Sequence, residues 1–279
     1  MCYTFAMQTT LTLNNGQQIP MIGYGTWKVR AEEGYQGVKH ALEAGYKHID
    51  TAEIYNNHFV IAKALQEAGV PREKLYITSK LWMDKRSSKA AQEATKQYLK
   101  ELKIDYLDLL LIHWPDSSVD VMETLQGMKE VQQQGLVRSI GVSNFTENHI
   151  QPILDAGINI QMNQIELHPS LPQPKLVAFC QQHSIAVTAY CPLGRGEDLS
   201  IPEIETIATK HSCSVAEVIL AWLLHKDVIV IPKALTPKYI NSNLKSYHLK
   251  LTDKNINIID NLSIQDNRIV DPDFGEFNL

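Results

Sequence analysis

Short runs of apolar residues alternate with stretches of helical periodicity along almost the whole chain. Between the runs, apolar residues recur at helical spacing, as in 31–44, which Gly45 closes, and in 88–102 and 119–134. Near-continuous apolar runs predict parallel strands that are buried on both faces. These predicted strands lie near residues 21–25, 46–50, 75–80, 106–113, 137–142, 159–164, 185–190 and 228–232.

The segment before the first run has a different pattern. Residues 10–20 alternate apolar and polar side chains around Asn15-Gly16, which is a strong signal for a β-hairpin. A length of 279 residues is ordinary for one α/β barrel. We therefore expect an α/β fold of the (β/α)₈ TIM-barrel type, formed by residues 1–279 as a single domain, with the N-terminal β-hairpin closing the bottom.

A doubly wound parallel sheet is the alternative fold. A dinucleotide-binding sheet of that kind is expected to carry Gly-x-Gly-x-x-Gly after its first strand. Lys28 stands where the third glycine would follow Gly23 and Gly25, and Leu199 stands there after Gly194 and Gly196. The missing glycines favour the barrel.

Three successive predicted strands end in residues that can carry chemistry. Asp50 ends one strand and Tyr55 follows it, while Lys80 and His113 end the next two. The active site of a barrel collects at the carboxyl ends of its strands, so we expect these side chains to meet. Read singly, three of them have a structural explanation. Tyr55 could be packing, Lys80 could extend its stem to solvent, and His113 could be a core histidine.

Together these residues suit the chemistry of a carbonyl group. A free phenol has a pKa of about 10, and a neighbouring ammonium such as that of Lys80 lowers it. Asp50 would compensate the buried ammonium, and neutral His113 could donate a hydrogen bond to a carbonyl oxygen. No activated serine or cysteine is evident, so we expect hydride transfer from a bound cofactor. The expected walls of the substrate pocket, for which core packing is the alternative, are Trp27, Trp82 and Trp114.

Composition narrows the choice of partner. The net charge of −5 and the pI near 6.1, with no basic stripe, argue against nucleic acid or an anionic membrane as the main partner. Four scattered cysteines without Cys-x-x-Cys, and histidines without metal-ligand spacing, predict reduced thiols and no metal. With no signal-peptide pattern and no 18-residue apolar run, we expect a cytoplasmic protein.

Five motifs, in order and over nearly the whole chain, resemble the aldo-keto reductase family: 50–55, 78–82, 111–115, 141–145 and 163–169. The resemblance implies that Tyr55 is the proton donor, that Lys80 and Asp50 tune it, and that His113 orients the carbonyl. Short loops and residues 266–272 are similar to the bacterial 2,5-diketogluconate and methylglyoxal reductase group. That similarity implies small dicarbonyls or sugar-derived carbonyls as substrates, with residues 274–279 folding over the pocket.

The resemblance also implies a nicotinamide dinucleotide site. Ser143, Asn144 and Gln164 offer a hydroxyl and two amides to a carboxamide, although turn capping is the alternative for the serine and asparagine. The ring of Tyr190 would stack on the planar part of the ligand. Phosphate groups would lie near Lys233 and the helix that follows it. The expected cofactor-binding residues are Gly25, Thr26, Asp50, Ser143, Asn144, Gln164, Tyr190, Leu193, Gly194, Lys233, Ala234, Leu235 and Asn243.

Some positions depart from the family pattern. His58 replaces a common glutamate, and Ala234 follows Lys233 where a hydroxyl residue is frequent. Tyr239 stands where many members place an arginine against the 2′-phosphate of the adenosine, and Ser242 replaces an acidic residue. We expect NADPH as the cofactor, with NADH used at lower efficiency.

The overall prediction is a monomeric NAD(P)H-dependent oxidoreductase that reduces small aldehydes and ketones. One rival is a nicotinamide-binding sensor or regulatory subunit with little turnover, which the retained Asp50, Tyr55, Lys80 and His113 disfavour. Another is a metal-dependent barrel hydrolase, for which the sequence supplies no ligand pattern.

Overall fold

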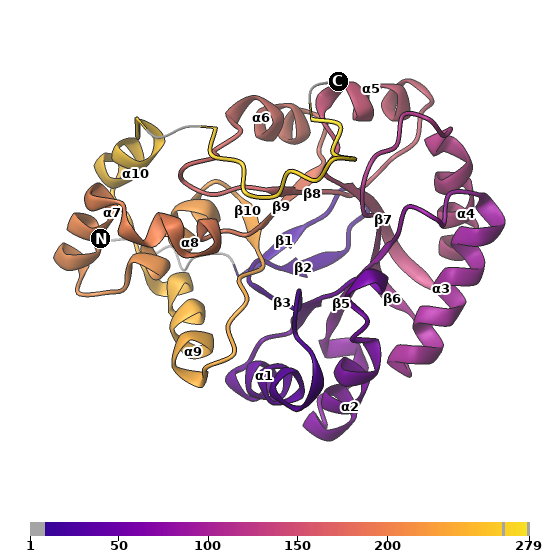
Figure 1. The fold of residues 1–279 in the computed structure, drawn as a ribbon, viewed down its shortest axis with the longest axis horizontal. Helices are drawn as coiled ribbons and strands as arrows, with labels where there is room; N and C mark the ends of the chain where they lie inside the picture. Colours follow the sequence, from indigo (N-terminus) through magenta and orange to yellow (C-terminus); the bar gives the residue numbers. More distant parts are fainter. Residues whose placement is uncertain (1–8, 264–265, 278–279) are drawn as a thin grey trace.

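A computed structural model describes residues 9–263 and 266–277. Eight parallel strands pair in strict chain order, and a further parallel bridge between Ile22 and Val230 joins the first to the last (Figure 1). The strand order of a doubly wound sheet reverses, so this closed ring confirms the predicted barrel. The strands are β3 (Gly23–Gly25), β4 (His48–Asp50), β5 (Tyr76–Leu81), β6 (Leu107–Ile112), β7 (Val137–Ser143), β8 (Met162–Glu166), β9 (Ala186–Tyr190) and β10 (Val228–Val230).

Helices surround this ring (Figure 1). The α-helices are α1 (Ala31–Ala44), α2 (His58–Ala68), α3 (Ser88–Leu102), α4 (Val121–Gln133), α5 (Glu147–Asp155), α6 (Pro174–Gln182), α7 (Pro202–His211), α8 (Val215–His225), α9 (Pro237–Lys245) and α10 (Asp253–Asp260). Short 3₁₀ helices are η1 (Glu53–Tyr55), η2 (Arg72–Lys74), η3 (Gly194–Ser200) and η4 (Ser246–His248).

The boundaries of α1 and α3 agree with the sequence prediction, whereas those of the other predicted elements differ by one residue or more. Helix α4 begins at Val121 because Asp120 caps it, accepting a hydrogen bond from the Met122 amide at 2.9 Å. Strand β8 spans Met162–Glu166 and not 159–164, although Ile160 and Gln161 just before it are as buried as the strand. Strand β10 stops at Val230, and Pro232 nearby has no N–H to extend the ladder.

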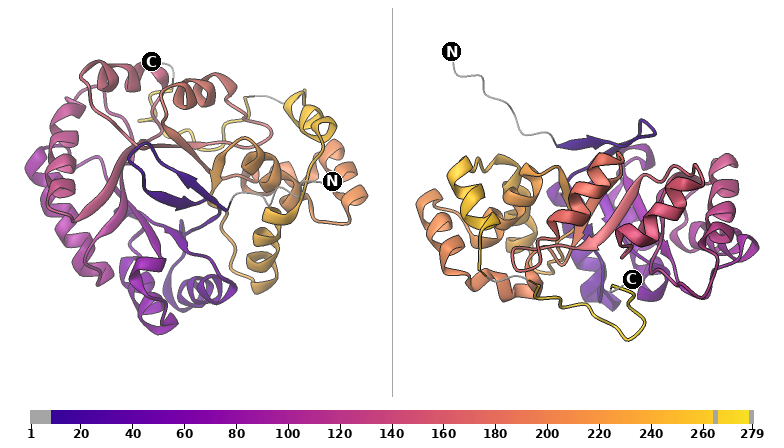
Figure 2. Two further views of the ribbon diagram at one scale, coloured as in Figure 1. Left: turned by 180° about the vertical axis from the view of Figure 1, so that it is seen from behind. Right: turned by 90° about the horizontal axis from the view of Figure 1, so that it is seen from above.

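The N-terminal hairpin covers one end of the barrel, as predicted. Its strands β1 (Thr10–Thr12) and β2 (Gln18–Pro20) pair antiparallel. In the turn, Asn14 donates hydrogen bonds to the Ile160 and Ser184 carbonyls at 2.9 and 3.0 Å, just before β8 and β9 begin. The hairpin therefore covers the amino ends of the strands, opposite the C-terminal segment (Figure 2). The carboxyl ends are left for a site.

No single helix in the described ranges has the length and hydropathy needed to cross a bilayer, and α7 with α8 reaches both only as a pair bent by 95°. Cys180, Cys191 and Cys213 carry free thiols. The fourth cysteine, Cys2, lies outside the described residues.

Candidate active site

A buried ion pair lies at the carboxyl ends of β4 and β5. Lys80, which is fully buried, donates hydrogen bonds to Asp50 Oδ1 at 2.5 Å and to the Thr51 carbonyl at 2.8 Å. The other carboxylate oxygen of Asp50 accepts a hydrogen bond from Gln164 Nε2 at 2.7 Å. Parallel pairing sets Asp50 beside Thr78, so Lys80 reaches just past the end of β4. The pair predicted from the sequence therefore forms.

Tyr55 lies beside this pair. The 3₁₀ turn η1, closed by a hydrogen bond from the Tyr55 amide to the Ala52 carbonyl, raises the residue above the end of β4. Lys80 Nζ is 5.2 Å from the centre of the phenol ring. The imidazole of His113 packs edge-on at 5.8 Å between ring centres. The structure thus brings Asp50, Tyr55, Lys80 and His113 together.

Burial controls the protonation of the phenol. It raises the pKa of Tyr55 well above the ordinary value of 10, and the negative charge of Asp50 raises it further. The sequence predicted a lowered pKa for Tyr55, and this net direction is wrong for the structure described, because burial outweighs an ammonium that is already paired with Asp50. Tyr55 keeps its proton throughout the physiological range, which is the form a proton donor needs.

His113 is a neutral group at the end of β6. Burial, with a contribution from the Lys80 charge, lowers the pKa of His113 well below its ordinary value of 6.5. Its Nδ1 atom is buried and has no hydrogen-bond partner among the described residues. The main-chain carbonyl of His113 accepts a hydrogen bond from Asn144 Nδ2 at 3.0 Å. The main chain of His113 is thus held in place, and its ring is uncharged at neutral pH.

Aromatic side chains surround these polar groups. Trp82 packs against His113 at 5.2 Å between ring centres, and Trp27, which is 41% exposed, packs against Tyr55 at 4.8 Å. From the C-terminal segment, Phe274 packs edge-on against Trp82 at 5.9 Å and Trp114 at 5.3 Å. The segment covers the aromatic pocket as predicted, as far as residue 277; residues 278–279 lie outside the described chain.

The groups expected to hold a carboxamide occupy neighbouring strand ends. Ser143 Oγ and the Asn144 amide both donate hydrogen bonds to the Gln164 carbonyl, at 2.8 and 2.9 Å. The Tyr190 hydroxyl donates to Asn144 Oδ1 at 2.7 Å. Thr26 Oγ1 donates to the Asp50 carbonyl at 2.8 Å. These side chains, at the ends of β3, β4, β7, β8 and β9, therefore form one polar surface, which we call the polar floor of the site.

The remaining candidates lie at the end of β3, between β10 and α9, on α9 and at the start of η3. Gly25 donates its amide to the Pro232 carbonyl at 3.2 Å, and a Cβ at residue 25 would lie 2.5 Å from the Ile231 carbonyl oxygen. Lys233 is exposed, whereas Ala234 and Leu235 are half-buried. Leu193 and Gly194 begin η3, and Asn243 is buried on α9. Only a glycine permits this close approach of β3 to the segment that precedes α9.

Sequence reasoning missed a buried cluster next to this site, formed by Glu166, His168 and Asp198. The first two belong to the 163–169 motif, but their role could not be read from it because Asp198 lies 30 residues further along. Cys191 was also missed. It lies close enough to Tyr55 to affect the phenol electrostatically, and burial raises the pKa of its thiol against the opposing charges of Arg195 and Lys233.

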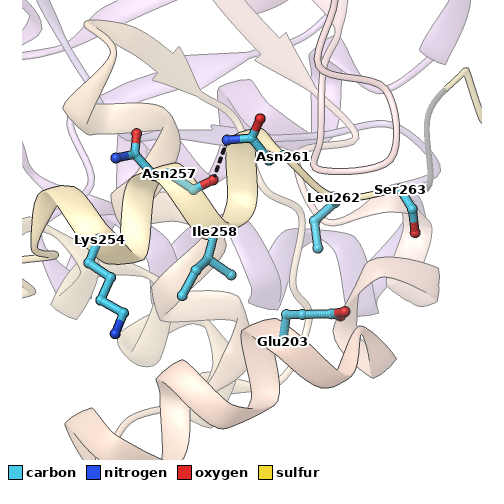
Figure 3. Close-up of a pocket in the computed structure, with 7 residues that line it drawn as sticks. All are labelled: Glu203, Lys254, Asn257, Ile258, Asn261, Leu262 and Ser263. Atoms are coloured by element: carbon cyan, nitrogen blue, oxygen red, sulfur yellow. Dashed lines mark hydrogen bonds between the residues drawn. The ribbon is translucent and has the colours of Figure 1, made fainter.

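Two of the hollows on the described surface bear on the location of the site. One of about 440 Å³ lies beside Asn144 and is bounded by Glu166, Arg268 and Phe277. The other, of about 720 Å³, lies between α7 and α10 and contains none of the predicted catalytic residues (Figure 3). In the described ranges no group of three or more His, Cys, Asp or Glu residues could hold a metal ion.

Comparison with known proteins agrees with this geometry. Residues 21–264 match the model of the aldo/keto reductase family. The chain belongs to that family. It is an oxidoreductase of the NAD(P)H-dependent type that the sequence predicted.

The chain is 40% identical to the methylglyoxal reductase DkgB of Escherichia coli O157:H7, over 91% of this chain and 97% of the relative. It is 36% identical to an aldehyde reductase of Saccharomyces cerevisiae, over 97% and 96% of the two chains. Among solved structures, a Bombyx mori aldo-keto reductase in complex with NADP is 36% identical, with a TM-score of 0.87 over 94% of each chain.

Proposed function

We propose that the protein reduces aldehydes and ketones to alcohols with NADPH, and that its substrates are small dicarbonyls or sugar-derived carbonyls. The observation that carries this proposal is the protonated phenol of Tyr55 beside neutral His113 and the buried Asp50–Lys80 pair. The substrate class is supported by the similarity to a methylglyoxal reductase and by the packing of Phe274 on Trp82 and Trp114 beside the site.

The polar floor of the site fits a nicotinamide dinucleotide. Ser143, Asn144 and Gln164 supply a hydroxyl and two amides at one edge, and Gln164 uses its amide N–H on Asp50, which leaves its oxygen as an acceptor. The ring of Tyr190 offers a flat surface. Exposed Lys233 precedes the first turn of α9, where a phosphate is favoured. When bound, the reduced nicotinamide would supply a hydride to the carbonyl carbon.

The side chains of this protein would perform the remaining steps. His113 donates a hydrogen bond that orients the carbonyl oxygen, and Tyr55 transfers its proton to that oxygen as negative charge develops. The resulting phenolate lies near the ammonium of Lys80, which stabilises it until a proton returns from water. Trp82 and Trp114 exclude water and strengthen these interactions.

A panel of aldehydes, ketones and dicarbonyls at fixed NADPH concentration, followed by loss of nicotinamide absorbance, tests the proposal. Turnover of small dicarbonyls above simple aldehydes is the expected result. If NADPH binds but no carbonyl is reduced, the proposal fails, and the protein is then a nicotinamide-binding sensor.

Turnover should change little across neutral pH. The active form carries protonated Tyr55, which is lost only as pH rises through a pKa raised well above 10, and neutral His113, which is lost only as pH falls through a pKa well below 6.5. We therefore expect kcat/KM to be flat from about pH 6.5 to about pH 9. A titration of kcat/KM within that window would contradict this assignment of protonation states.

The protein should prefer NADPH to NADH, but less strongly than relatives with an arginine at position 239. Lys233 can pair with the 2′-phosphate as a point charge, whereas Tyr239, which is 58% exposed, offers only a hydroxyl or a ring face. A hydrogen bond to a charged group is worth about 1.5–3 kcal/mol, so the missing guanidinium costs roughly 10- to 100-fold in discrimination.

The measurement is kcat/KM for both cofactors on one carbonyl substrate. Tyr239→Arg should widen the ratio, and Tyr239→Phe, which removes only the hydroxyl, is the matched control that should not widen it. Equal use of both cofactors by the wild type would show that Lys233 does not contact the phosphate. An unchanged ratio in Tyr239→Arg would show that residue 239 does not face the adenosine.

We further propose that residues 1–279 act as one domain and that the enzyme is a cytoplasmic monomer. One chain supplies every side chain of the proposed site, and three cysteines are free thiols. Sedimentation at assay concentration tests the oligomeric state.

A further inference from the structure

A fully buried charge cluster lies beside the proposed site. His168 contacts Glu166 Oε1 through Nε2 at 3.1 Å and Asp198 Oδ2 through Nδ1 at 2.9 Å. All three side chains are at most 3% exposed. An imidazole can donate to both carboxylates only when it is doubly protonated, so His168 is an imidazolium between two anions. The side-chain hydrogen bonds raise its pKa against the effect of burial, which agrees with this state.

Glu166 holds the first part of the C-terminal segment. Its two carboxylate oxygens accept hydrogen bonds from the successive amides of Ile269 and Val270, at 2.8 and 2.9 Å. The Asn267 amide also donates to the Ser170 carbonyl at 3.0 Å. These bonds fix the point from which the segment crosses the barrel to place Phe274 on the tryptophans. Glu166 therefore fixes the start of the C-terminal segment that covers the proposed substrate site.

Asp198 holds the other side of the cluster. It lies in η3, the turn that begins with Gly194. Besides His168, it accepts hydrogen bonds from Ser170 Oγ at 2.6 Å and from the Ser170 amide at 3.2 Å. A Cβ on Gly194 would lie 2.8 Å from the Asp198 carboxylate, so the start of the turn packs directly on it. A displacement of Gly194 toward Asp198 would therefore push on its carboxylate.

We propose that His168 is a positioning residue that couples dinucleotide binding at η3 to the placing of the C-terminal segment over the carbonyl substrate. The coupling rests on the proposed function, with Leu193 and Gly194 among the residues that the family resemblance assigns to the cofactor. Neither carboxylate can move away from the imidazolium without leaving a buried charge unpaired, which is strongly unfavourable. The start of the C-terminal segment and the cofactor turn therefore keep one relative placement. A ligand that holds one of them in place also holds the other, so each ligand assists the binding of the second.

Crossed effects test this coupling. Asp198→Asn leaves the hydrogen bonds of Glu166 to Ile269 and Val270 in place, yet it should raise the KM of the carbonyl substrate. Glu166→Gln leaves the contacts of Asp198 with the cofactor turn in place, yet it should raise the Kd of NADPH, measured by fluorescence in the absence of carbonyl. Coupling between sites typically amounts to about 5-fold or more, and each crossed effect should be of that size. Ser170→Ala, which removes one hydrogen bond from Asp198 and no charge, is a milder variant should Asp198→Asn fail to fold.

Two controls separate coupling from general damage. Glu276→Gln loosens the far end of the segment, where Glu276 accepts hydrogen bonds from Ser117 and His149, and it should raise the carbonyl KM without changing the NADPH Kd. Asp108→Asn breaks a buried pair with Arg72 at the amino end of β6 and should lower thermal stability without a crossed effect.

The proposal is overturned if Asp198→Asn, or Ser170→Ala in its place, alters only NADPH binding while Glu166→Gln alters only the carbonyl KM. It is equally overturned if Asp108→Asn, at matched loss of thermal stability, gives the same crossed effects. An inactive wild type would instead overturn the proposed function, so the two failures are distinguishable.

Discussion

Tyr55→Phe should abolish most carbonyl reduction and leave the affinity for NADPH unchanged. The phenol acts on the substrate oxygen, and the substitution removes only its hydroxyl, so the ring contacts with Trp27 and His113 persist. General acid catalysis contributes roughly 10²- to 10⁴-fold to a rate, and kcat should fall by that factor. The measurements are kcat on a small dicarbonyl and the Kd of NADPH by fluorescence.

Tyr190→Phe is the matched control, because it also removes one phenolic hydroxyl near the site. That hydroxyl donates to Asn144, so the control should weaken cofactor binding and keep the proton donor. Turnover by Tyr55→Phe within about tenfold of the wild type would show that another group donates the proton.

Lys80→Met should impair both turnover and stability. The fully buried ammonium is hydrogen-bonded to Asp50 and to the Thr51 carbonyl, and its loss leaves a buried carboxylate without a counter-ion. Removing one partner of a buried pair costs about 3–5 kcal/mol of unfolding free energy. The phenolate formed after proton transfer would also lack a nearby cation, so we expect kcat to fall by about 10²-fold or more.

Thermal unfolding and kcat should be measured together for this variant. Lys85→Met is the control, since Lys85 pairs with Glu53 outside the polar core at 3.4 Å and is 24% exposed. Wild-type turnover in Lys80→Met would exclude any part for the ammonium in the reaction. Loss of stability with full retention of kcat would limit Lys80 to a structural role.

The barrel and its four central polar residues could be predicted from the sequence for one physical reason. Parallel strands bring their carboxyl ends to one rim, so residues that end successive apolar runs must meet there even when they are far apart in the chain. Asp50, Lys80 and His113 follow this rule directly. Tyr55 follows it through a single 3₁₀ turn.

Other properties depend on what surrounds a residue, which the order of residues along the chain does not show. The predicted direction of the Tyr55 pKa shift was wrong because that direction depends on how completely the phenol is buried. The partnership of His168 with Asp198 was missed because it joins two loops without strand pairing between them. The start of β8 was placed too early because Ile160, which precedes the strand in irregular structure, is as buried as a strand residue.

The parallel bridge between Ile22 and Val230 has a consequence for synthesis on the ribosome. At about 5–20 residues per second, the 208 residues that separate the two partners take roughly 10–40 s to be made. During that interval the outer edge of β3 has no neighbour to pair with, and open strand edges invite association with other chains. Gly23, Tyr24 and Gly25 form an edge only three residues long, which limits that exposure.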